Sequence, residues 1–267
     1  MTSLNSFDVH VTEVGAAVGF LSGLLGKGGS AVTTPVLRVF LGVPEFAALA
    51  SPLPSAMPTA LAASWAYRGR DLVDVQAVKT TCLWGIPATV IGSLLSHWVG
   101  GPALMAMTAL FVISLGVSLS IHGHSMPDEA DDAERIAPGA HWKLTVIAIG
   151  VGLFSGLLAN TGGILYAPLF IQWVNMPPKR ALATSLIVSA VLAVPGTLTH
   201  WWLGHVDWRI VVLLSIGAIP FSYLGASVAI RLRSRTLIRV YGALLTLFGF
   251  YDLLITEGFA ARLLRLR

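Results

Sequence analysis

The residues best suited to chemistry lie in two short glycine-rich segments, each of which interrupts an apolar stretch. Residues 26–29 read Gly-Lys-Gly-Gly, and residues 160–163 read Asn-Thr-Gly-Gly. A backbone that is broken inside a membrane exposes N–H groups that lipid cannot satisfy, so such breaks persist only where protein or a polar cavity surrounds them. The helix that resumes after each break directs free N–H groups and the positive end of its dipole into that space. These groups are suited to binding an anion.

Lys27 is the single residue most indicative of function, because an ammonium group in an apolar interior is costly and usually functional. It lies inside the first break, where an anion would bind. The alternative is that its side chain extends along the apolar surface to reach the membrane interface. The corresponding residue of the second break is Asn160, so the predicted site is asymmetric and carries one formal positive charge. The glycines also have an alternative role, since small residues let membrane helices pack closely. The duplication of the break favours a binding site.

A second polar cluster lies in the third apolar stretch of each half of the chain. Residues 50–55 (Ala-Ser-Pro-Leu-Pro-Ser) correspond to residues 183–188 (Ala-Thr-Ser-Leu-Ile-Val). Their hydroxyl groups could contact an anion or, alternatively, bond back to the preceding helical turn. Asp74 and Asp207 begin the fourth stretches, where we predict that they cap helices. The candidate substrate-binding residues are Lys27, Gly28, Gly29, Ser30, Ser51, Asn160, Thr161, Gly162, Gly163, Thr184 and Ser185.

The composition is typical of a membrane protein. Of the 267 residues, 55% are hydrophobic and 11% are charged, and the mean hydropathy is +0.77. A soluble domain carries about 25% charged residues. Residues 102–121 contain no charge, and about 20 such residues span a bilayer. The basic residues lie between apolar stretches, which argues against a nucleic-acid-binding surface, and no cleavable signal is predicted.

The chain contains an internal repeat. When residue 19 is placed on residue 152 and the register is kept, the two halves align without a gap over a long stretch. Low complexity does not account for the ordered Gly, Pro and Asp matches. The matching positions are Gly19 and Gly152, residues 22–25 and 155–158, Gly29 and Gly162, Pro35 and Pro168, Pro44 and Pro177, residues 48–50 and 181–183, Asp74 and Asp207, Pro87 and Pro220, and Gly92 and Gly225.

Each half reads as five apolar pieces, and the first two flank the glycine-rich break. The pieces are residues 12–26, 30–43, 46–67, 77–98 and 102–121, and then 143–160, 163–175, 180–203, 209–230 and 236–255. Pieces of about 15 residues are too short to cross a bilayer and indicate re-entrant half-helices. We therefore predict an all-α polytopic membrane protein of two inverted repeats, each with a broken or re-entrant helix pair and three transmembrane helices. Residues 1–121 form the first repeat, 122–142 an acidic linker and 143–267 the second repeat.

The distribution of Lys and Arg predicts the orientation. If each half crosses an odd number of times, eleven basic residues share one side and four the other, which favours both termini outside. An even number would give parallel repeats. The basic C-terminal tail argues against the orientation with both termini outside. The eleven are Arg68, Arg70, Lys79, Arg135, Lys143, Lys179, Arg180, Arg231, Arg233, Arg235 and Arg239, and the four are Arg209, Arg262, Arg265 and Arg267.

Other classes of function fit the sequence less well. Ser22 or Ser155 with His200 could form an intramembrane serine hydrolase dyad, but the spacing lacks a nucleophile-turn pattern. The histidines show no paired spacing typical of metal or heme ligands, and the single cysteine offers no cysteine metal site. We therefore predict no enzyme activity, no metal and no cofactor. An anion-selective passive channel is the stronger alternative to a carrier.

The repeated motifs resemble those of the TauE/SafE sulfite exporter family. The resemblance rests on residues 19–29 followed by Pro35, on residues 152–163 followed by Pro168, and on Thr184-Ser185. It covers nearly the whole chain and implies a multi-pass carrier of the bacterial inner membrane that exports sulfite, sulfonates or related anions. The chain departs from the family pattern at Lys27, Ser30, Ala159, Thr161 and Ser51-Pro52, and these departures leave the particular anion open.

The sequence thus predicts a secondary transporter that works by alternating access around one anion site near the midplane. Its expected partners are a small anion and the lipid bilayer, with no nucleic acid, and a homo-oligomer is left open. Two proline–glycine pairs, Pro87 with Gly92 and Pro220 with Gly225, could provide flexion points, although packing alone would also explain them. The exact anion, the direction of transport and the coupling ion are not fixed by the sequence.

Overall fold

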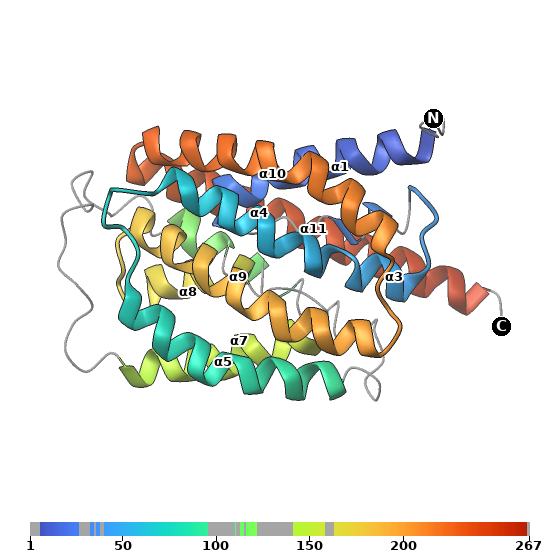
Figure 1. The fold of residues 1–267 in the computed structure, drawn as a ribbon, viewed down its shortest axis with the longest axis horizontal. Helices are drawn as coiled ribbons and strands as arrows, with labels where there is room; N and C mark the ends of the chain where they lie inside the picture. Colours follow the sequence, from blue (N-terminus) through green and yellow to red (C-terminus); the bar gives the residue numbers. More distant parts are fainter. Residues whose placement is uncertain are drawn as a thin grey trace.

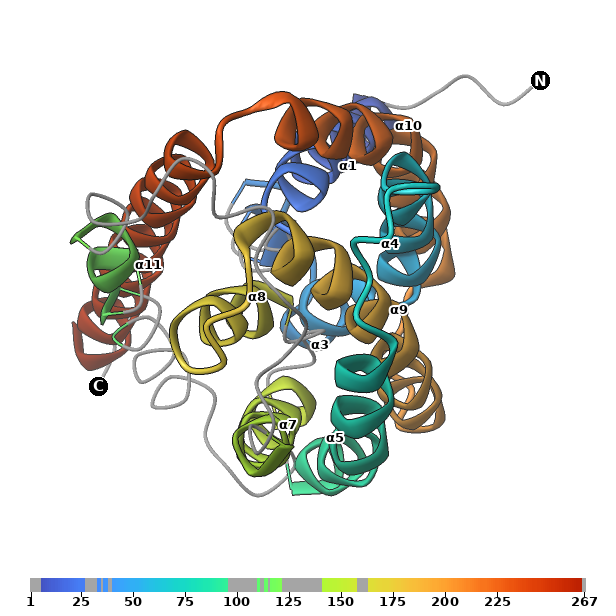
Figure 2. The ribbon, with the colours of Figure 1, turned by 90° about the vertical axis from the view of Figure 1, so that its left-hand side faces the viewer.

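The computed structural model describes residues 6–26, 33–34, 36–37, 40–95, 110, 113–114, 116–121, 141–157 and 163–265. Every regular element in these ranges is a helix, and the helices lie side by side along the long axis of the molecule (Figures 1 and 2). They are α1 (Ser6–Leu24), α3 (Glu45–Ala50), α4 (Pro52–Ala66), α5 (Val75–Leu95), α7 (His141–Leu157), α8 (Gly163–Gln172), α9 (Pro178–Trp202), α10 (Trp208–Arg231) and α11 (Ser234–Arg265).

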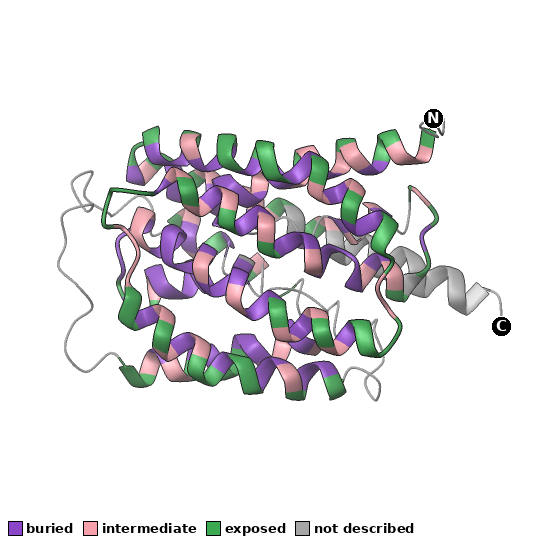
Figure 3. Cartoon of the chain, in the orientation of Figure 1, coloured by how far each residue is buried: buried purple, intermediate pink, exposed green. Residues whose placement is uncertain are grey.

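Four helical segments in the described ranges are long and apolar enough to cross a membrane: Phe46–Ala66, Val75–Leu95, Pro178–Trp202 and Trp208–Arg231. Exposed residues lie along the outer faces of these helices (Figure 3), and many of them are large and apolar. On α5 they include Leu83 and Ile91, and on α10 they include Val212 and Ile216. Such faces are unfavourable in water and suited to lipid. The expected all-α polytopic membrane protein is thereby confirmed.

Helices that occupy equivalent places in the two halves run in opposite directions along the molecule. In Figure 1, α1, α4 and α10 run from right to left, whereas α7, α9 and α5 run from left to right. Helix α1 corresponds to α7, α4 to α9, and α5 to α10.

The contacts between helices are also duplicated. Helix α1 packs on α10, and α7 packs on α5, in both cases through glycines so close to the partner backbone that an added Cβ would overlap it. Three of these contacts in one pair have their counterparts at the equivalent repeat positions in the other. The corresponding contacts are Gly19 on Ala218 and Gly152 on Gly85, Gly23 on Ser222 and Gly156 on Thr89, and Gly225 on Phe20 and Gly92 on Leu153. Close packing therefore accounts for Gly92 and Gly225, whereas flexion at these positions stays a prediction.

The start of helix α7 and the end of helix α8 lie at the same end of the molecule. The Lys143 Nζ, on the first turn of α7, donates to the carbonyl oxygen of Trp173, which follows α8, at 2.9 Å. In the first half, Val11 of α1 packs in one buried cluster with Leu37 and Val43, so the chain also comes back to the end where α1 begins.

Positive charge is concentrated at the end of the molecule that lies on the left of Figure 1. This end contains the α4–α5 loop, the starts of α7 and α9, and the α10–α11 connection. The start of α1 and the α9–α10 loop lie at the other end, where Arg209 pairs with Asp8 at 2.7 Å. The segments of the first end carry Arg68, Arg70, Lys79, Lys143, Lys179, Arg180, Arg231, Arg233 and Arg235. The grouping of these nine residues agrees with the predicted division of Lys and Arg.

Candidate functional site

The start of the first glycine break, Gly26, contacts helix α9 of the second half. Gly26 follows α1 with φ +61°, a conformation that favours glycine. The Ser185 hydroxyl of α9 lies within hydrogen-bond distance of two carbonyl oxygens, those of Gly26 at 3.0 Å and Leu182 at 2.9 Å. A Cβ on Gly26 would lie 2.7 Å from the Ser185 Oγ. The candidate residue Ser185 is therefore in direct contact with the residue before Lys27.

The remaining break residues fall largely outside the described ranges. Residue 163 is described, and Gly163 begins helix α8. Seven candidate residues lie outside: Lys27, Gly28, Gly29, Ser30, Asn160, Thr161 and Gly162.

Ser51 and Thr184, which occupy equivalent positions, make equivalent contacts across the two halves. The backbone N–H of Asp207 donates to the Ser51 Oγ, and that of Asp74 donates to the Thr184 Oγ1, each at 3.0 Å. Both hydroxyl oxygens thus accept a bond from a loop of the opposite half, and each hydroxyl retains its hydrogen for donation. The two loops, residues 67–74 and 203–207, lie at opposite ends of the molecule (Figure 1), so these two candidate residues lie toward different ends.

The two aspartates cap helices, as the sequence predicts. The Asp74 Oδ1 accepts from the Ala77 N–H at 2.9 Å, and the Asp207 Oδ1 accepts from the Arg209 and Ile210 N–H groups at 2.9 and 3.4 Å. Each aspartate therefore fixes the start of one long helix while its own N–H is held by a hydroxyl of the other half.

We expect Ser51→Ala to lower the free energy of unfolding by about 1–3 kcal/mol, because the backbone N–H of Asp207 would lose its partner. Thr184→Val should have a similar effect through Asp74. Thermal unfolding in detergent would measure the stability of both variants. The controls Ser51→Thr and Thr184→Ser keep the hydroxyl, and their stability should be close to that of the parental protein. Equal stability of the hydroxyl-free and hydroxyl-bearing variants would contradict the structural role of these two bonds.

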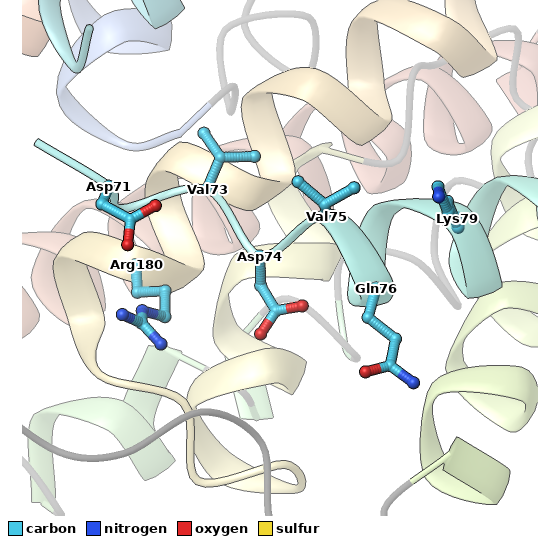
Figure 4. A pocket seen from close by; sticks show the side chains of 7 residues that line it. All are labelled: Asp71, Val73, Asp74, Val75, Gln76, Lys79 and Arg180. Atoms are coloured by element: carbon cyan, nitrogen blue, oxygen red, sulfur yellow. The ribbon is translucent and has the colours of Figure 1, made fainter. Parts of the chain in front are cut away.

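A polar pocket of about 510 Å³ opens at the positively charged end (Figure 4). Figure 4 shows that the loop before α5 and the first turns of α5 form most of its wall, and that Arg180 reaches it from α9. Arg180 makes no ion pair or hydrogen bond within the described part of the chain, and its repeat equivalent is Ala47. The pocket residues are Asp71, Val73, Asp74, Val75, Gln76, Lys79 and Arg180.

The pocket wall is linked to the contact with Gly26 by neighbouring residues of α9. Asp74 lines the pocket and donates its N–H to Thr184, and the next residue, Ser185, contacts Gly26. The Arg180 guanidinium, which has no ionic partner among the described residues, lines the same pocket. From the sequence, Arg180 was counted only among the basic residues of one side, and the pocket was missed because its walls come from segments of both halves that lie far apart in the chain.

The tryptophans that end α9 and His200 have different environments. Trp201 and Trp202 are exposed and suit a membrane interface. The His200 side chain, in contrast to the two tryptophans, is buried, with only 3% of its surface exposed. Its Nε2 lies 3.4 Å from the Gly156 carbonyl oxygen, and its Nδ1 lies 3.3 Å from the Nδ1 of His205. His200 therefore faces the interior rather than the interface.

Comparison with known proteins identifies similar sequences. The family model described as sulfite exporter TauE/SafE matches residues 12–251. The probable membrane transporter protein YunE of Bacillus subtilis is 26% identical over 94% of this chain and 98% of its own length. A probable membrane transporter protein of Xylella fastidiosa is 27% identical over 89% of this chain and 91% of its own. The chain is also 22% identical to the probable membrane transporter protein MJ0441 of Methanocaldococcus jannaschii, over 90% of this chain and 93% of the relative. No solved structure matches the chain.

Proposed function

The chain belongs to the TauE/SafE sulfite exporter family, and from that membership we propose that it exports a small sulfur-containing anion such as sulfite or an organosulfonate. The match over residues 12–251 carries the proposal. The family consists of membrane transporters rather than enzymes, which agrees with the expectation of a multi-pass transporter without enzyme activity. Its expected location is the bacterial inner membrane.

We further propose that residues 1–121 and 143–267 are inverted repeats, joined by the linker 122–142, and that they alternate access to a shared site. The opposite directions of corresponding helices and the duplicated glycine contacts support this arrangement. The α1–α10 and α5–α7 pairs are packed so closely that each would move as one body. Motion of these bodies relative to α4 and α9 would then open the site to either side, with the anion bound throughout.

The proposed anion site lies between the two break tips. Support comes from the contact of Ser185 with Gly26, which brings the first tip against the second half. Helix N-terminal N–H groups and the ammonium of Lys27 would bind the anion, together with Asn160 and nearby hydroxyls. Ser51 and Thr184 would donate their remaining hydrogens on either side of the tips. The full proposed set is Lys27, Gly28, Gly29, Ser30, Ser51, Asn160, Thr161, Gly162, Gly163, Thr184 and Ser185.

The function can be tested by measuring uptake of ³⁵S-labelled sulfite and of a labelled organosulfonate into liposomes that contain the purified protein. A carrier should show uptake that saturates with concentration and counterflow when the liposomes are preloaded with unlabelled anion. Linear uptake without counterflow would favour the alternative, an anion-selective channel. Absence of transport of either anion, in liposomes with correctly folded protein, would contradict the proposed substrate class.

Arg180 is expected to capture the anion at the mouth of the polar pocket. Because its guanidinium is only partly buried, we expect Arg180→Gln to remove about 1 kcal/mol of attraction and to raise the KM for sulfite about fivefold. The effect should shrink as ionic strength rises, and Arg180→Lys should retain most of the affinity.

The matched control for Arg180 is Arg68→Gln at the same end of the molecule. The Arg68 guanidinium lies over the Trp65 ring, 4.4 Å from its centroid, and the residue does not line the pocket. The control should keep the parental KM. An equal rise of the KM in both variants would indicate a general effect of surface charge. It would contradict the role of Arg180 in capturing the anion.

A further inference from the structure

Several buried hydroxyl groups on helices α5, α8 and α9 have no hydrogen-bond partner in the described part of the chain. They are the Oγ1 atoms of Thr81 and Thr89 on α5, the phenol oxygen of Tyr166 on α8 and the Oγ of Ser189 on α9. All four residues are at most 2% exposed. A buried hydroxyl without a partner has lost its bonds to water without replacing them, which is unfavourable, and native proteins contain few such groups.

Three of these hydroxyls belong to three neighbouring helices: Tyr166 of α8 meets α5 and α9 at Gly85 and Leu192, and Thr81 and Ser189 lie about one helical turn before those two residues. A Cβ on Gly85 of α5 would lie 3.4 Å from the Tyr166 phenol oxygen and 3.2 Å from the Leu192 Cδ2 of α9. Helices α5 and α9 run in the same direction (Figure 1) and pack on each other. Thr81 lies one turn before Gly85, and Ser189 lies three residues before Leu192, so these two residues face the same level from adjacent helices.

The repeat supports this grouping independently, because the residues at the equivalent repeat positions meet around one small cavity of about 30 Å³. Leu214 corresponds to Thr81, Ala56 to Ser189 and Thr33 to Tyr166, and all three line that cavity. Its wall also contains the counterparts of Gly85 and Leu192, which are Ala218 and Thr59. The repeat positions equivalent to Thr81, Tyr166 and Ser189 therefore converge at this cavity, which takes residues from both halves of the chain.

The two equivalent places differ in the side chains that they contain. Around the cavity, the Ser55 and Thr59 hydroxyls donate to backbone carbonyl oxygens at 2.8 and 2.6 Å. Hydroxyls without partners are therefore not a general consequence of the repeat architecture. At the place around Gly85, Tyr166 and Leu192 stand where the cavity has the smaller Thr33 and Thr59. Thr81 and Ser189 supply hydroxyls there, whereas their counterparts at the cavity, Leu214 and Ala56, are apolar.

We propose that Thr81, Tyr166 and Ser189 form an oxyanion subsite that Leu192 closes in the described conformation. The inference rests on the proposed function and names further residues for the same substrate. Three hydroxyls can each donate one hydrogen bond to an oxygen of a sulfite or sulfonate group, which offers three acceptors. Neutral donors bind such a group less tightly than a second cation would, so the anion can leave, as transport requires. The anion reaches the subsite when Leu192 and the Tyr166 ring move apart.

The test uses three variants that remove one hydroxyl each with little change of shape: Thr81→Val, Tyr166→Phe and Ser189→Ala. Uptake of ³⁵S-labelled sulfite into liposomes is measured together with thermal unfolding in detergent. Each variant should raise the KM by about three- to tenfold while the melting temperature stays equal or rises, because the lost hydroxyl leaves no described partner behind in the closed state. The matched control is Tyr241→Phe, a fully buried tyrosine on α11, a helix that contributes nothing to the subsite. This control should keep the parental KM.

The outcomes separate the subsite from the proposed function. A parental protein that transports sulfite, with all three variants unchanged in KM, overturns the subsite and leaves the transporter in place. A fall in melting temperature without a change in KM also overturns it, since the hydroxyls would then serve the fold. A parental protein that transports no sulfur oxyanion overturns the proposed function and the subsite with it. Leu192→Ala provides an independent check, because opening the subsite should lower the KM, and an unchanged KM contradicts the closing role of Leu192.

Discussion

Gly156→Ala is expected to destabilise the protein by about 1–3 kcal/mol, whereas Gly150→Ala on the same helix is expected to stabilise it by about 0.5–1 kcal/mol. The added Cβ at residue 156 would overlap the Thr89 carbonyl oxygen and lie 2.6 Å from the Ser93 N. These are backbone atoms of α5, so only a separation of the two helices can relieve the overlap. A Cβ at residue 150 meets nothing within 4 Å, and alanine favours the helix over glycine.

The opposite signs make the comparison a sharp test of the α5–α7 contact. Melting temperatures of the two variants in the same detergent would measure it, and the yield of monodisperse protein provides a second readout. Gly23→Ala, which would overlap the Ser222 carbonyl oxygen in the α1–α10 pair, should match Gly156→Ala in size. If Gly156→Ala were as stable as Gly150→Ala, the close contact of α7 with α5 would be wrong. If only one of Gly23→Ala and Gly156→Ala lowered the melting temperature, the α1–α10 and α5–α7 pairs would not be packed in the same way.

The architecture could be predicted from the sequence because its causes are local or periodic. The length of the apolar stretches identifies membrane helices without knowledge of their neighbours. Alignment of the two halves reveals the duplication, and the glycines it matches, such as Gly23 and Gly156, are the ones that bring helices into backbone contact. The helix caps at Asp74 and Asp207 also depend only on residues close in sequence.

The contacts between the halves could not be predicted in the same way. Alignment makes Ser51 and Thr184 equivalent, and both were predicted to contact the same anion. In space each pairs with the aspartate of the opposite half, and the two lie toward different ends of the molecule. A repeat identifies equivalent residues, but it does not reveal which half supplies the partner of each. The pocket at Arg180 and the hydroxyl of Tyr166 were missed for a related reason, since both depend on which side chains meet across distant segments.

Ser185 gives the clearest connection between the sequence-based hypothesis and the structure. The sequence indicated an anion site between two glycine breaks, one in each half, with a hydroxyl cluster in the third apolar stretch of each half. The structure brings the described edge of the first break, Gly26, into contact with that hydroxyl. The Gly26 carbonyl, at the end of the described part of the first half, is thus held by a side chain of the second half.

Lys27→Ala is expected to lower kcat/KM for sulfite by about 10- to 100-fold. An ammonium group that donates to an anion in a partly dry site contributes about 1.5–3 kcal/mol, and about 1.4 kcal/mol corresponds to a factor of ten. Lys27→Arg, which keeps the charge, should retain part of the activity. The same ³⁵S-labelled uptake assay measures both variants, with melting temperatures recorded beside it so that a folding defect is recognised.

The control for Lys27 is Arg70→Ala, which removes one positive charge from an exposed residue that does not line the pocket. It should transport sulfite like the parental protein, because an exposed charge is screened by salt and water. Undiminished transport by Lys27→Ala would remove Lys27 from the mechanism and favour the alternative in which its side chain extends to the interface. The anion would then depend on helix N-terminal N–H groups and hydroxyls alone. In that case Tyr166→Phe, rather than Lys27→Ala, should produce the larger loss of affinity.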